Sequence, residues 1–263
     1  MDPGKKRRLR RIFRRDGRTV IVPMDHGVTV GPIKGLVKMQ EIVNQLLKGG
    51  ADALIVHKGI AKHVDVGDAG LIIHLSGITK LNPDPDNKVQ VCSVEEALRI
   101  GADAVSVHIN VGAQKEDRML EKLGRVAADC DSYGMPLLAM MYPRGPTIKD
   151  EHAVALIAHA ARLGAELGAD IVKTNYTGSI ETFKEVVEGC PVPVIIAGGP
   201  KMESAEDVLQ MAYDSIKAGS SGLSIGRNVF QHSSPALMVK ALSAIVHGDA
   251  SVQEALRILG EVP

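Results

Sequence analysis

Eight short runs rich in valine, isoleucine and leucine recur along the sequence, and longer segments with helical periodicity separate them. This alternation is typical of β-α-β units, whose parallel strands are buried on both faces. The runs occupy residues 20–25, 53–57, 70–75, 104–110, 136–141, 170–174, 194–197 and 222–225. Eight such units most simply close into a single (β/α)8 barrel, a TIM barrel in the α/β class. A doubly wound open sheet is the structural alternative.

The segments between these runs carry the signals of helices and their ends. Helices are predicted over residues 36–47, 94–100, 115–133, 151–167, 180–187, 204–218 and 236–246, with a short extra helix at 251–259. The tripeptide Gly-Ala-Asp recurs at 50–52, 101–103 and 168–170, where the glycine can end a helix in the left-handed conformation. Ser93 with Glu96, and Ser251 with Glu254, predict capping boxes at two helix starts.

The first residues form an extension that precedes the barrel pattern. The chain has 263 residues, which suits one barrel domain over 1–263 with an N-terminal helical extension at 1–18. Leu9, Ile12 and Phe13 give the basic segment 5–15 one apolar stripe, which is typical of an amphipathic helix. We expect it to cover the bottom of the barrel; a contact to RNA or phosphate is the alternative.

Composition excludes several classes of protein. Thirty-one basic and 31 acidic residues give a net charge of zero, which argues against a nucleic-acid or anionic-membrane binder. Three widely separated cysteines, Cys92, Cys130 and Cys190, predict free thiols in a cytoplasmic protein. No apolar run reaches the roughly 18 residues that span a bilayer, and no secretory signal begins the chain.

Lys173 is the strongest candidate for chemistry. It lies within the apolar run 170–174 and shares a face with Ile171, so it points into an aliphatic barrel. Loss of hydration lowers the pKa of a lysine, and a neutral amine can attack a ketone to form an imine. A buried lysine paired with a carboxylate is the structural alternative.

Two further residues at strand ends are candidates for proton transfer. Tyr142 follows the fifth run and could relay protons beside an imine, although it could equally close the core. Asp25 ends the first run, and the alternation of side chains places it on the inner face of the barrel. A carboxylate is costly there unless it is paired or takes part in the chemistry. Arg144 is either an anion contact or a loop charge. The long, proline-rich loop 76–88 resembles a lid.

Glycine-bearing loops follow the last two runs, where barrels usually bind phosphate. Gly198 and Gly199 follow the seventh run, and Gly226 with Arg227 follows the eighth. Glycines expose backbone N–H groups, and an arginine offers a fork of donors to phosphate. Gly27 and Gly31 predict a tight turn after the first run through which backbone can approach a ligand.

Four histidines near the ends of the first four runs support a rival hypothesis. A metal-dependent aldolase or hydrolase could draw its ligands from His26, His57, His74 and His108. The sequence has no His-x-His pair at the first run, and the alternation of side chains along the strands does not direct these histidines to one point. We therefore predict no metal, and the histidines are interpreted as satisfied groups at the barrel mouth.

Several of these motifs together resemble those of the archaeal-type class I aldolases. They read VPMDHG at 22–27, MYPRG at 141–145, IVKT at 171–174, and the Gly198-Gly199 and Gly226-Arg227 loops, and the resemblance covers nearly the whole chain. It implies that Lys173 forms the Schiff base, Tyr142 donates a proton and Asp25 accepts one. The substrate and phosphate site implied by the resemblance comprises Asp25, His26, Gly27, Val28, Thr29, Tyr142, Pro143, Arg144, Lys173, Gly198, Gly199, Gly226 and Arg227.

Within that family the chain is most similar to the branch of 2-amino-3,7-dideoxy-D-threo-hept-6-ulosonate synthases. That branch implies a transaldol transfer from 6-deoxy-5-ketofructose 1-phosphate to L-aspartate semialdehyde in aromatic amino acid biosynthesis, with no cofactor and a homo-oligomeric enzyme. The sister branch, the class I fructose-bisphosphate aldolases, needs the same residues; Met140 in place of an aromatic residue favours the synthase. A sugar-phosphate isomerase or a binding barrel without imine chemistry is the alternative from another class.

Overall fold

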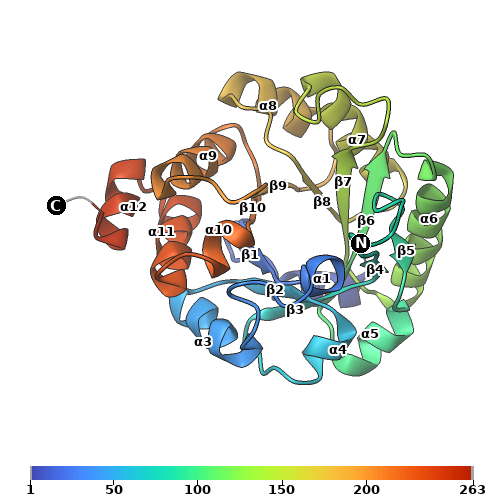
Figure 1. Cartoon of the computed structure of the whole chain (residues 1–263), viewed down its shortest axis with the longest axis horizontal. Helices are drawn as coiled ribbons and strands as arrows, with labels where there is room; N and C mark the ends of the chain where they lie inside the picture. The colour runs from blue at the N-terminus through green and yellow to red at the C-terminus, as the bar shows by residue number, and fades with distance from the viewer. Residues whose placement is uncertain (1, 262–263) are drawn as a thin grey trace.

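Eight parallel strands form a closed ring in the computed structural model, which describes residues 2–261. Their order around the barrel is β1-β10-β9-β8-β7-β6-β3-β2 (Figure 1). The strands are β1 Thr19–Pro23, β2 Ala53–Val56, β3 Gly70–His74, β6 Ala104–Val111, β7 Leu137–Pro143, β8 Ile171–Thr174, β9 Val194–Ala197 and β10 Gly222–Ser224. All eight predicted runs are barrel strands, so the closed barrel is confirmed and the open sheet is wrong.

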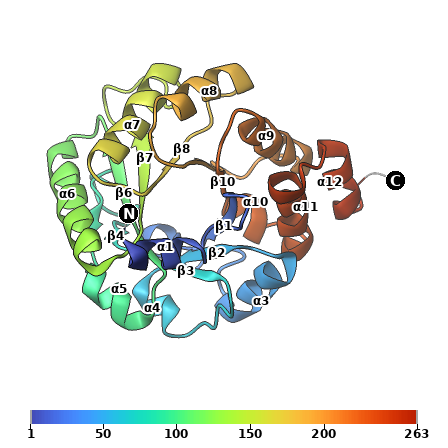
Figure 2. The same ribbon diagram turned by 180° about the vertical axis from the view of Figure 1, so that it is seen from behind.

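The longer helices surround the ring of strands on the outside in both end-on views, whereas α1 lies across the end of the barrel (Figures 1 and 2). The longer ones are α3 Met39–Gly49, α5 Val94–Ile100, α6 Glu116–Tyr133, α7 Val154–Glu166, α8 Ile180–Glu188, α9 Ala205–Lys217, α11 Pro235–Gly248 and α12 Val252–Leu259. Gly50, Gly101 and Gly168 take φ values of 87°, 91° and 98°, so the predicted helix-ending device is confirmed at all three joints. The capping box is complete at Ser251, whereas at Ser93 only one half forms, because the Glu96 carboxylate pairs with Lys58 instead.

Alternate residues of each strand build two separate cores. The outward-facing residues pack against the helices in one large cluster that contains, for example, Val22 and Val172. The inward-facing residues fill the barrel with a smaller cluster that includes Ile21, Ile171 and Tyr142. Branched aliphatic side chains suit both positions, because a parallel strand in a barrel is buried on both faces.

The N-terminal segment closes the amino end of the barrel. The helix α1 runs over Pro3–Leu9, shorter than the predicted 5–15, and Ile12 follows it in a turn. Ile12 is fully buried and belongs to the inner core, against which Leu9 and Phe13 pack. The prediction that this segment covers the barrel bottom is confirmed, although its apolar stripe does not lie on one continuous helix.

The three repeated Gly-Ala-Asp joints receive this N-terminal segment. Asp52 pairs with Arg14, Asp103 pairs with Arg11 at 2.9 Å, and Asp170 pairs with Lys5 at 3.0 Å. Each carboxylate also accepts a hydrogen bond from the backbone of the neighbouring strand, at the N–H of Val20, Leu71 and Leu137 respectively. Each aspartate therefore binds both a backbone N–H near the start of the neighbouring strand and a buried or half-buried cation.

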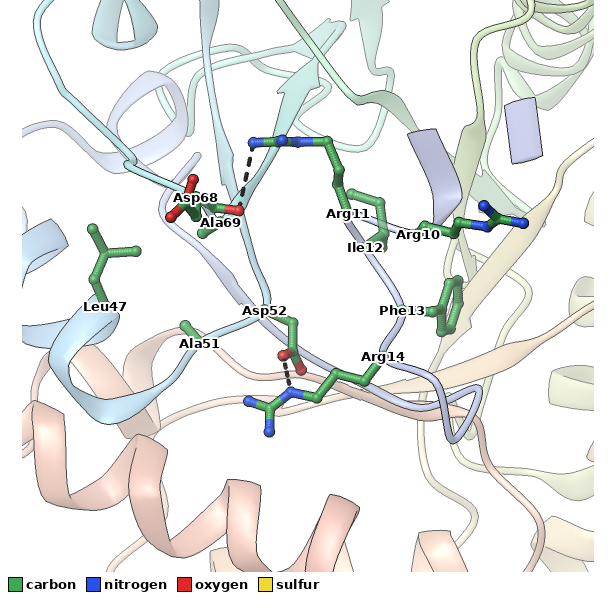
Figure 3. A pocket seen from close by; sticks show the side chains of 10 residues that line it. All are labelled: Arg10, Arg11, Ile12, Phe13, Arg14, Leu47, Ala51, Asp52, Asp68 and Ala69. Carbon is green, nitrogen blue, oxygen red and sulfur yellow. Dashed lines mark hydrogen bonds and ion pairs between the residues drawn. The ribbon is translucent and has the colours of Figure 1, made fainter. Parts of the chain in front are cut away.

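A hollow of about 530 Å³ lies between this N-terminal segment and the amino ends of β2 and β3 (Figure 3). Arg11 and Arg14 line it, and the figure shows Arg14 directed at Asp52 and Arg11 directed at the backbone oxygen of Asp68. It lies at the opposite end of the strands from Lys173, so it is distinct from the candidate active site.

The loop predicted as a lid forms a small hairpin over the carboxyl end of the barrel. The strands β4, Ser76–Gly77, and β5, Val89–Gln90, pair antiparallel and enclose residues 78–88. The sequence did not predict this hairpin, because two-residue strands carry no readable period. Three single-turn helices, α2 Gly27–Val30, α4 Lys58–Ala61 and α10 Arg227–Phe230, were also missed.

Candidate active site

Lys173 lies inside the barrel near the carboxyl end of β8. Its side chain is only 6% exposed, and the inward-facing Ile171 lies below it on the same strand. Burial lowers the pKa of the Lys173 amine to about 8, although the nearby Asp25 carboxylate opposes this shift. With that pKa, roughly a tenth of the amine is neutral at pH 7, several hundred times the neutral fraction of an exposed lysine.

Asp25 lies two residues after β1 and is surrounded by histidines. His74 Nε2 lies 3.7 Å from one carboxylate oxygen, and His26 Nδ1 lies 3.6 Å from the other. Burial favours the neutral acid, but His74, His26 and Lys173 outweigh it and hold the pKa of Asp25 well below its ordinary value. Asp25 is therefore an ionised acceptor within electrostatic reach of the candidate amine.

Tyr142 stands on β7, which pairs directly with β8. Met140 pairs with Lys173 in the register of these strands, so Tyr142 lies one inward position closer to the mouth. Burial raises the pKa of the Tyr142 phenol, and the phenol keeps its proton at physiological pH. The guanidinium of Arg144 lies 5.7 Å from the centre of the tyrosine ring. Its Nε and Nη2 atoms donate to the two carboxylate oxygens of Glu151, at 2.9 and 2.8 Å.

These three groups supply the requirements of imine chemistry. Lys173 offers a nucleophilic amine, Tyr142 an un-ionised phenol and Asp25 an ionised carboxylate, and all three face the same end of the barrel. An amine that forms an imine with a ketone makes an electron sink, and proton transfers on either side then require one donor and one acceptor.

The two predicted phosphate loops meet at the ends of β9 and β10. A side chain at Gly198 would meet Ile225, and one at Gly226 would meet His26 and the Pro23 carbonyl, each at under 3 Å. Glycine is required at both positions because the loops approach their neighbours this closely. Arg227 donates a hydrogen bond to the Gly199 carbonyl at 2.9 Å, which holds the guanidinium against the loop after β9.

Asn228 fixes the cradle, and the sequence analysis missed it. Its amide donates to the carbonyls of Gly198, at 2.8 Å, and Pro200, at 3.0 Å, and accepts from the backbone of Met202 at 2.7 Å. A buried asparagine directly after a glycine-arginine pair was the available signal.

The segment after β1 differs from its prediction. Residues from Gly27 to Val30, expected as a tight turn, form the single-turn helix α2, which Gly31 ends with a φ of 76°. His26 precedes this helix and packs edge-on against Phe230, with ring centroids 5.2 Å apart. Val28 is exposed and Thr29 accepts a backbone hydrogen bond from Lys80 in the lid loop.

The other histidines line the mouth beside Tyr142 and Asp25. His108 lies 5.0 Å from the Tyr142 ring, and His57 lies 5.3 Å from His74, centroid to centroid. His74 Nδ1 is 2.8 Å from Ser106 Oγ, and burial lowers the pKa of His74 to about 3, so its ring is neutral. Among residues 2–261, no three histidine, cysteine or acidic side chains come together as a metal site would require.

The strand β6 contributes more to this site than the sequence predicted. Ser106, His108 and Asn110 occupy alternate positions on it, and none was assigned apart from the histidine. Period two along the strand would have placed all three on the inner face with the barrel core.

Comparison with known proteins identifies the family. The sequence profile of the DeoC/LacD family aldolases matches residues 19–232. The chain is a member of the DeoC/LacD aldolase family. It is 48% identical to a 2-amino-3,7-dideoxy-D-threo-hept-6-ulosonate synthase of Halobacterium salinarum over 263 residues, which cover 99% of this chain and 98% of the relative. It is 42% identical to a 2-amino-4,5-dihydroxy-6-oxo-7-(phosphonooxy)heptanoate synthase of Streptomyces griseus, over 93% of this chain and 90% of the relative.

Solved structures agree with this assignment. An archaeal fructose-1,6-bisphosphate aldolase, with its catalytic lysine covalently bound to the carbinolamine intermediate of the substrate, superposes with a TM-score of 0.87. It is 35% identical, and the match covers 92% of this chain and 99% of that structure. The chain is thus an aldolase-type enzyme of a family that acts on phosphorylated sugars. Among the described residues, no helix has both the length and the apolar character to cross a membrane.

Proposed function

We propose that this enzyme makes 2-amino-3,7-dideoxy-D-threo-hept-6-ulosonate from 6-deoxy-5-ketofructose 1-phosphate and L-aspartate semialdehyde, a transaldol transfer that belongs to aromatic amino acid biosynthesis. The observation that carries this proposal is the desolvated Lys173 amine, whose pKa of about 8 suits imine formation, between a protonated Tyr142 and an ionised Asp25. The high identity to synthases along nearly the full chain supports the choice of substrates.

The first half of the proposed reaction cleaves the ketose. The neutral Lys173 amine adds to the C5 ketone, and loss of water gives the protonated imine. An acceptor, Asp25 in this proposal, takes the proton of the C3 hydroxyl, and the electrons of the C3–C4 bond move onto C4 to give an enamine. The phosphorylated three-carbon aldehyde leaves, and an unphosphorylated three-carbon fragment stays on Lys173.

The second half builds the product. The enamine carbon attacks the aldehyde carbon of L-aspartate semialdehyde, and Tyr142 protonates the oxygen that becomes a hydroxyl. Water then adds to the imine and releases the seven-carbon ketone, which restores the free amine. The imine accepts the electron pair in the first half and the enamine returns it in the second, so the proposed steps call on no metal or organic cofactor.

The cradle around Gly198, Gly199, Gly226 and Arg227 is proposed to hold the ketose phosphate. It lies beside β8, so it could also hold a phosphate next to the ketone, as class I fructose-bisphosphate aldolase would require. The second candidate function is therefore that aldolase, which the 35% identity to an archaeal fructose-1,6-bisphosphate aldolase favours. An isomerase or binding barrel without imine chemistry would leave the unusual environment of Lys173 without a use.

A product assay tests this proposal. The enzyme is incubated with 6-deoxy-5-ketofructose 1-phosphate and L-aspartate semialdehyde, and separately with fructose 1,6-bisphosphate, and the products are identified by mass spectrometry. We expect the amino-dideoxyheptulosonate from the first pair at a much higher rate than triose phosphates from the bisphosphate. The reverse preference would establish the bisphosphate aldolase, and an enzyme that isomerises the sugars without cleavage would refute both.

We also propose that the enzyme is a cytoplasmic homo-oligomer. The free thiols of Cys92, Cys130 and Cys190 suit a reducing compartment, and Val37 and Leu81 expose apolar surface at 68% and 94%. Light scattering on the purified enzyme tests the second statement, and a monomeric mass would refute it.

A further inference from the structure

Lys88 is a cation at the barrel mouth that the proposed reaction has not used. It lies at the end of the lid loop 78–88, and its ammonium donates a hydrogen bond to the Pro85 carbonyl at 2.9 Å. The described part of the chain gives it no ion pair, and its side chain is half-buried, so burial lowers the pKa of Lys88. By contrast, the guanidinium of Arg144 binds both carboxylate oxygens of Glu151. A half-buried cation without a charged partner is costly unless a ligand completes it.

A buried lysine of α6 holds Lys88 in this place. Lys122 is only 3% exposed, and its ammonium donates to three oxygens: the Lys88 carbonyl at 2.6 Å, Ser76 Oγ at 3.0 Å and the His108 carbonyl at 3.2 Å. Asn110, fully buried on β6, donates to the carbonyl of Asp86 at 2.7 Å. The lid loop is therefore fixed to the barrel at two alternate residues.

Lys88 lies near the reacting groups but far around the barrel from the phosphate cradle. Its charge acts on Asp25 and on His108, whose ring packs against Tyr142. The strand β6, which anchors the loop, is four strands from β10 in either direction around the ring, so the two lie on opposite sides of the mouth (Figure 1). The mouth thus offers anion-binding groups on both sides of Lys173.

The charges beside Lys88 fit a zwitterion better than a phosphate. Asp86, two residues earlier in the same loop, is the carboxylate that acts most strongly on Lys88, and the next charge is the Arg144 guanidinium, which is already paired with Glu151. L-Aspartate semialdehyde carries a carboxylate and an ammonium group on one carbon, which a neighbouring cation and anion complement. A phosphate dianion would be repelled by Asp86, and the cradle already offers it backbone N–H groups.

We infer that Lys88, held in place by Lys122 and Asn110, binds the carboxylate of the incoming amino-acid aldehyde, in a subsite separate from the phosphate cradle. This inference rests on the proposed function. It makes Lys88 a specificity-determining residue and Lys122 a positioning residue, and it explains why a lysine is buried in α6 with only neutral oxygens as partners.

Steady-state kinetics with each substrate varied in turn tests this inference. Lys88→Met removes the ammonium but keeps the carbonyl to which Lys122 binds. We expect the KM for L-aspartate semialdehyde to rise by about 10- to 100-fold, the usual loss for a hydrogen bond to a charged group, with the KM for the phosphorylated ketose and kcat nearly unchanged. Lys88→Arg should recover most of the affinity, and Lys80→Met, in an exposed position of the same loop, is the matched control.

Lys122→Met should raise the same KM, because the loop loses one of its two attachments, while borohydride trapping of the ketose on Lys173 stays normal. An unchanged KM in Lys88→Met, or an equal rise in the KM of both substrates, would overturn the separate subsite. A normal KM in Lys122→Met would overturn its positioning role. A wild-type enzyme that makes no product from the two substrates would remove the proposed function itself, together with this inference; a failure confined to the variants leaves that function standing.

Discussion

Replacing Lys173 with methionine should make the protein more stable at neutral pH while abolishing its activity. The pKa of the Lys173 amine is about 8, against 10.5 for an exposed lysine. Between these two values the unfolded chain binds more protons than the folded one, so the stability of the wild type rises with pH in that window. The difference in pKa corresponds to about 3 kcal/mol, the cost of keeping the charged amine inside the barrel at pH 7.

Lys173→Met has no such cost, because methionine has a similar length and no charge to desolvate. We expect it to exceed the wild type by about 3 kcal/mol at pH 7, with the gap closing between pH 8 and 10.5. Urea unfolding at pH 7, 8, 9 and 10 measures the gap, and Lys80→Met, an exposed lysine, is the control that should show none. A gap that does not vary with pH, or a variant less stable than the wild type at pH 7, would refute the desolvated amine.

Three further predictions concern the site and the barrel bottom. Below pH 8, kcat/KM should rise about tenfold per pH unit and level off above it, because only the neutral Lys173 amine attacks the ketone; a flat profile from pH 6 to 9 would contradict this. Tyr142→Phe should lower turnover by about 10²- to 10⁴-fold while borohydride still traps substrate on Lys173, and normal turnover would exclude the phenol as proton donor. Asp170→Asn should lower the free energy of unfolding by about 2 kcal/mol or more, because the buried Lys5 loses a charged partner. Asp131, the other partner of Lys5, has a 74% exposed side chain, so Asp131→Asn should cost less than about 1 kcal/mol. Equal losses in the two variants would contradict the larger contribution of Asp170.

The sequence predicted the barrel because its strands are buried on both faces. Runs such as 53–56 and 194–197 are continuous aliphatic stretches, and the spacing of the eight runs leaves room for helices between them. The same periodicity placed Lys173 and Tyr142 inside the barrel, since alternate residues of a strand share a face. The Gly-Ala-Asp joints predicted helix ends, but nothing local showed that their aspartates pair with Arg14, Arg11 and Lys5, which are far away in the chain.

The missed residues depend on contacts between distant segments. Lys122 shares the buried face of α6 with Met119 and Val126, but a lysine is usually exposed, and only the folded lid loop supplies the oxygens that its ammonium binds. Asn228 follows a recognised motif, yet its role comes from carbonyls near Gly198, which the sequence cannot bring into contact with it. The short helix α2 replaced a predicted turn because glycine at both ends of the segment permits either structure.

Borohydride trapping tests the imine at Lys173 most directly. The enzyme is incubated separately with 6-deoxy-5-ketofructose 1-phosphate and with fructose 1,6-bisphosphate, then reduced, and the modified peptide is located by mass spectrometry. We predict a three-carbon adduct without phosphate on Lys173, formed from the first sugar. A dihydroxyacetone phosphate adduct from the second sugar would keep the imine but move the enzyme to the bisphosphate aldolases. An enzyme that turns over either sugar without any adduct on Lys173 would contradict the imine mechanism.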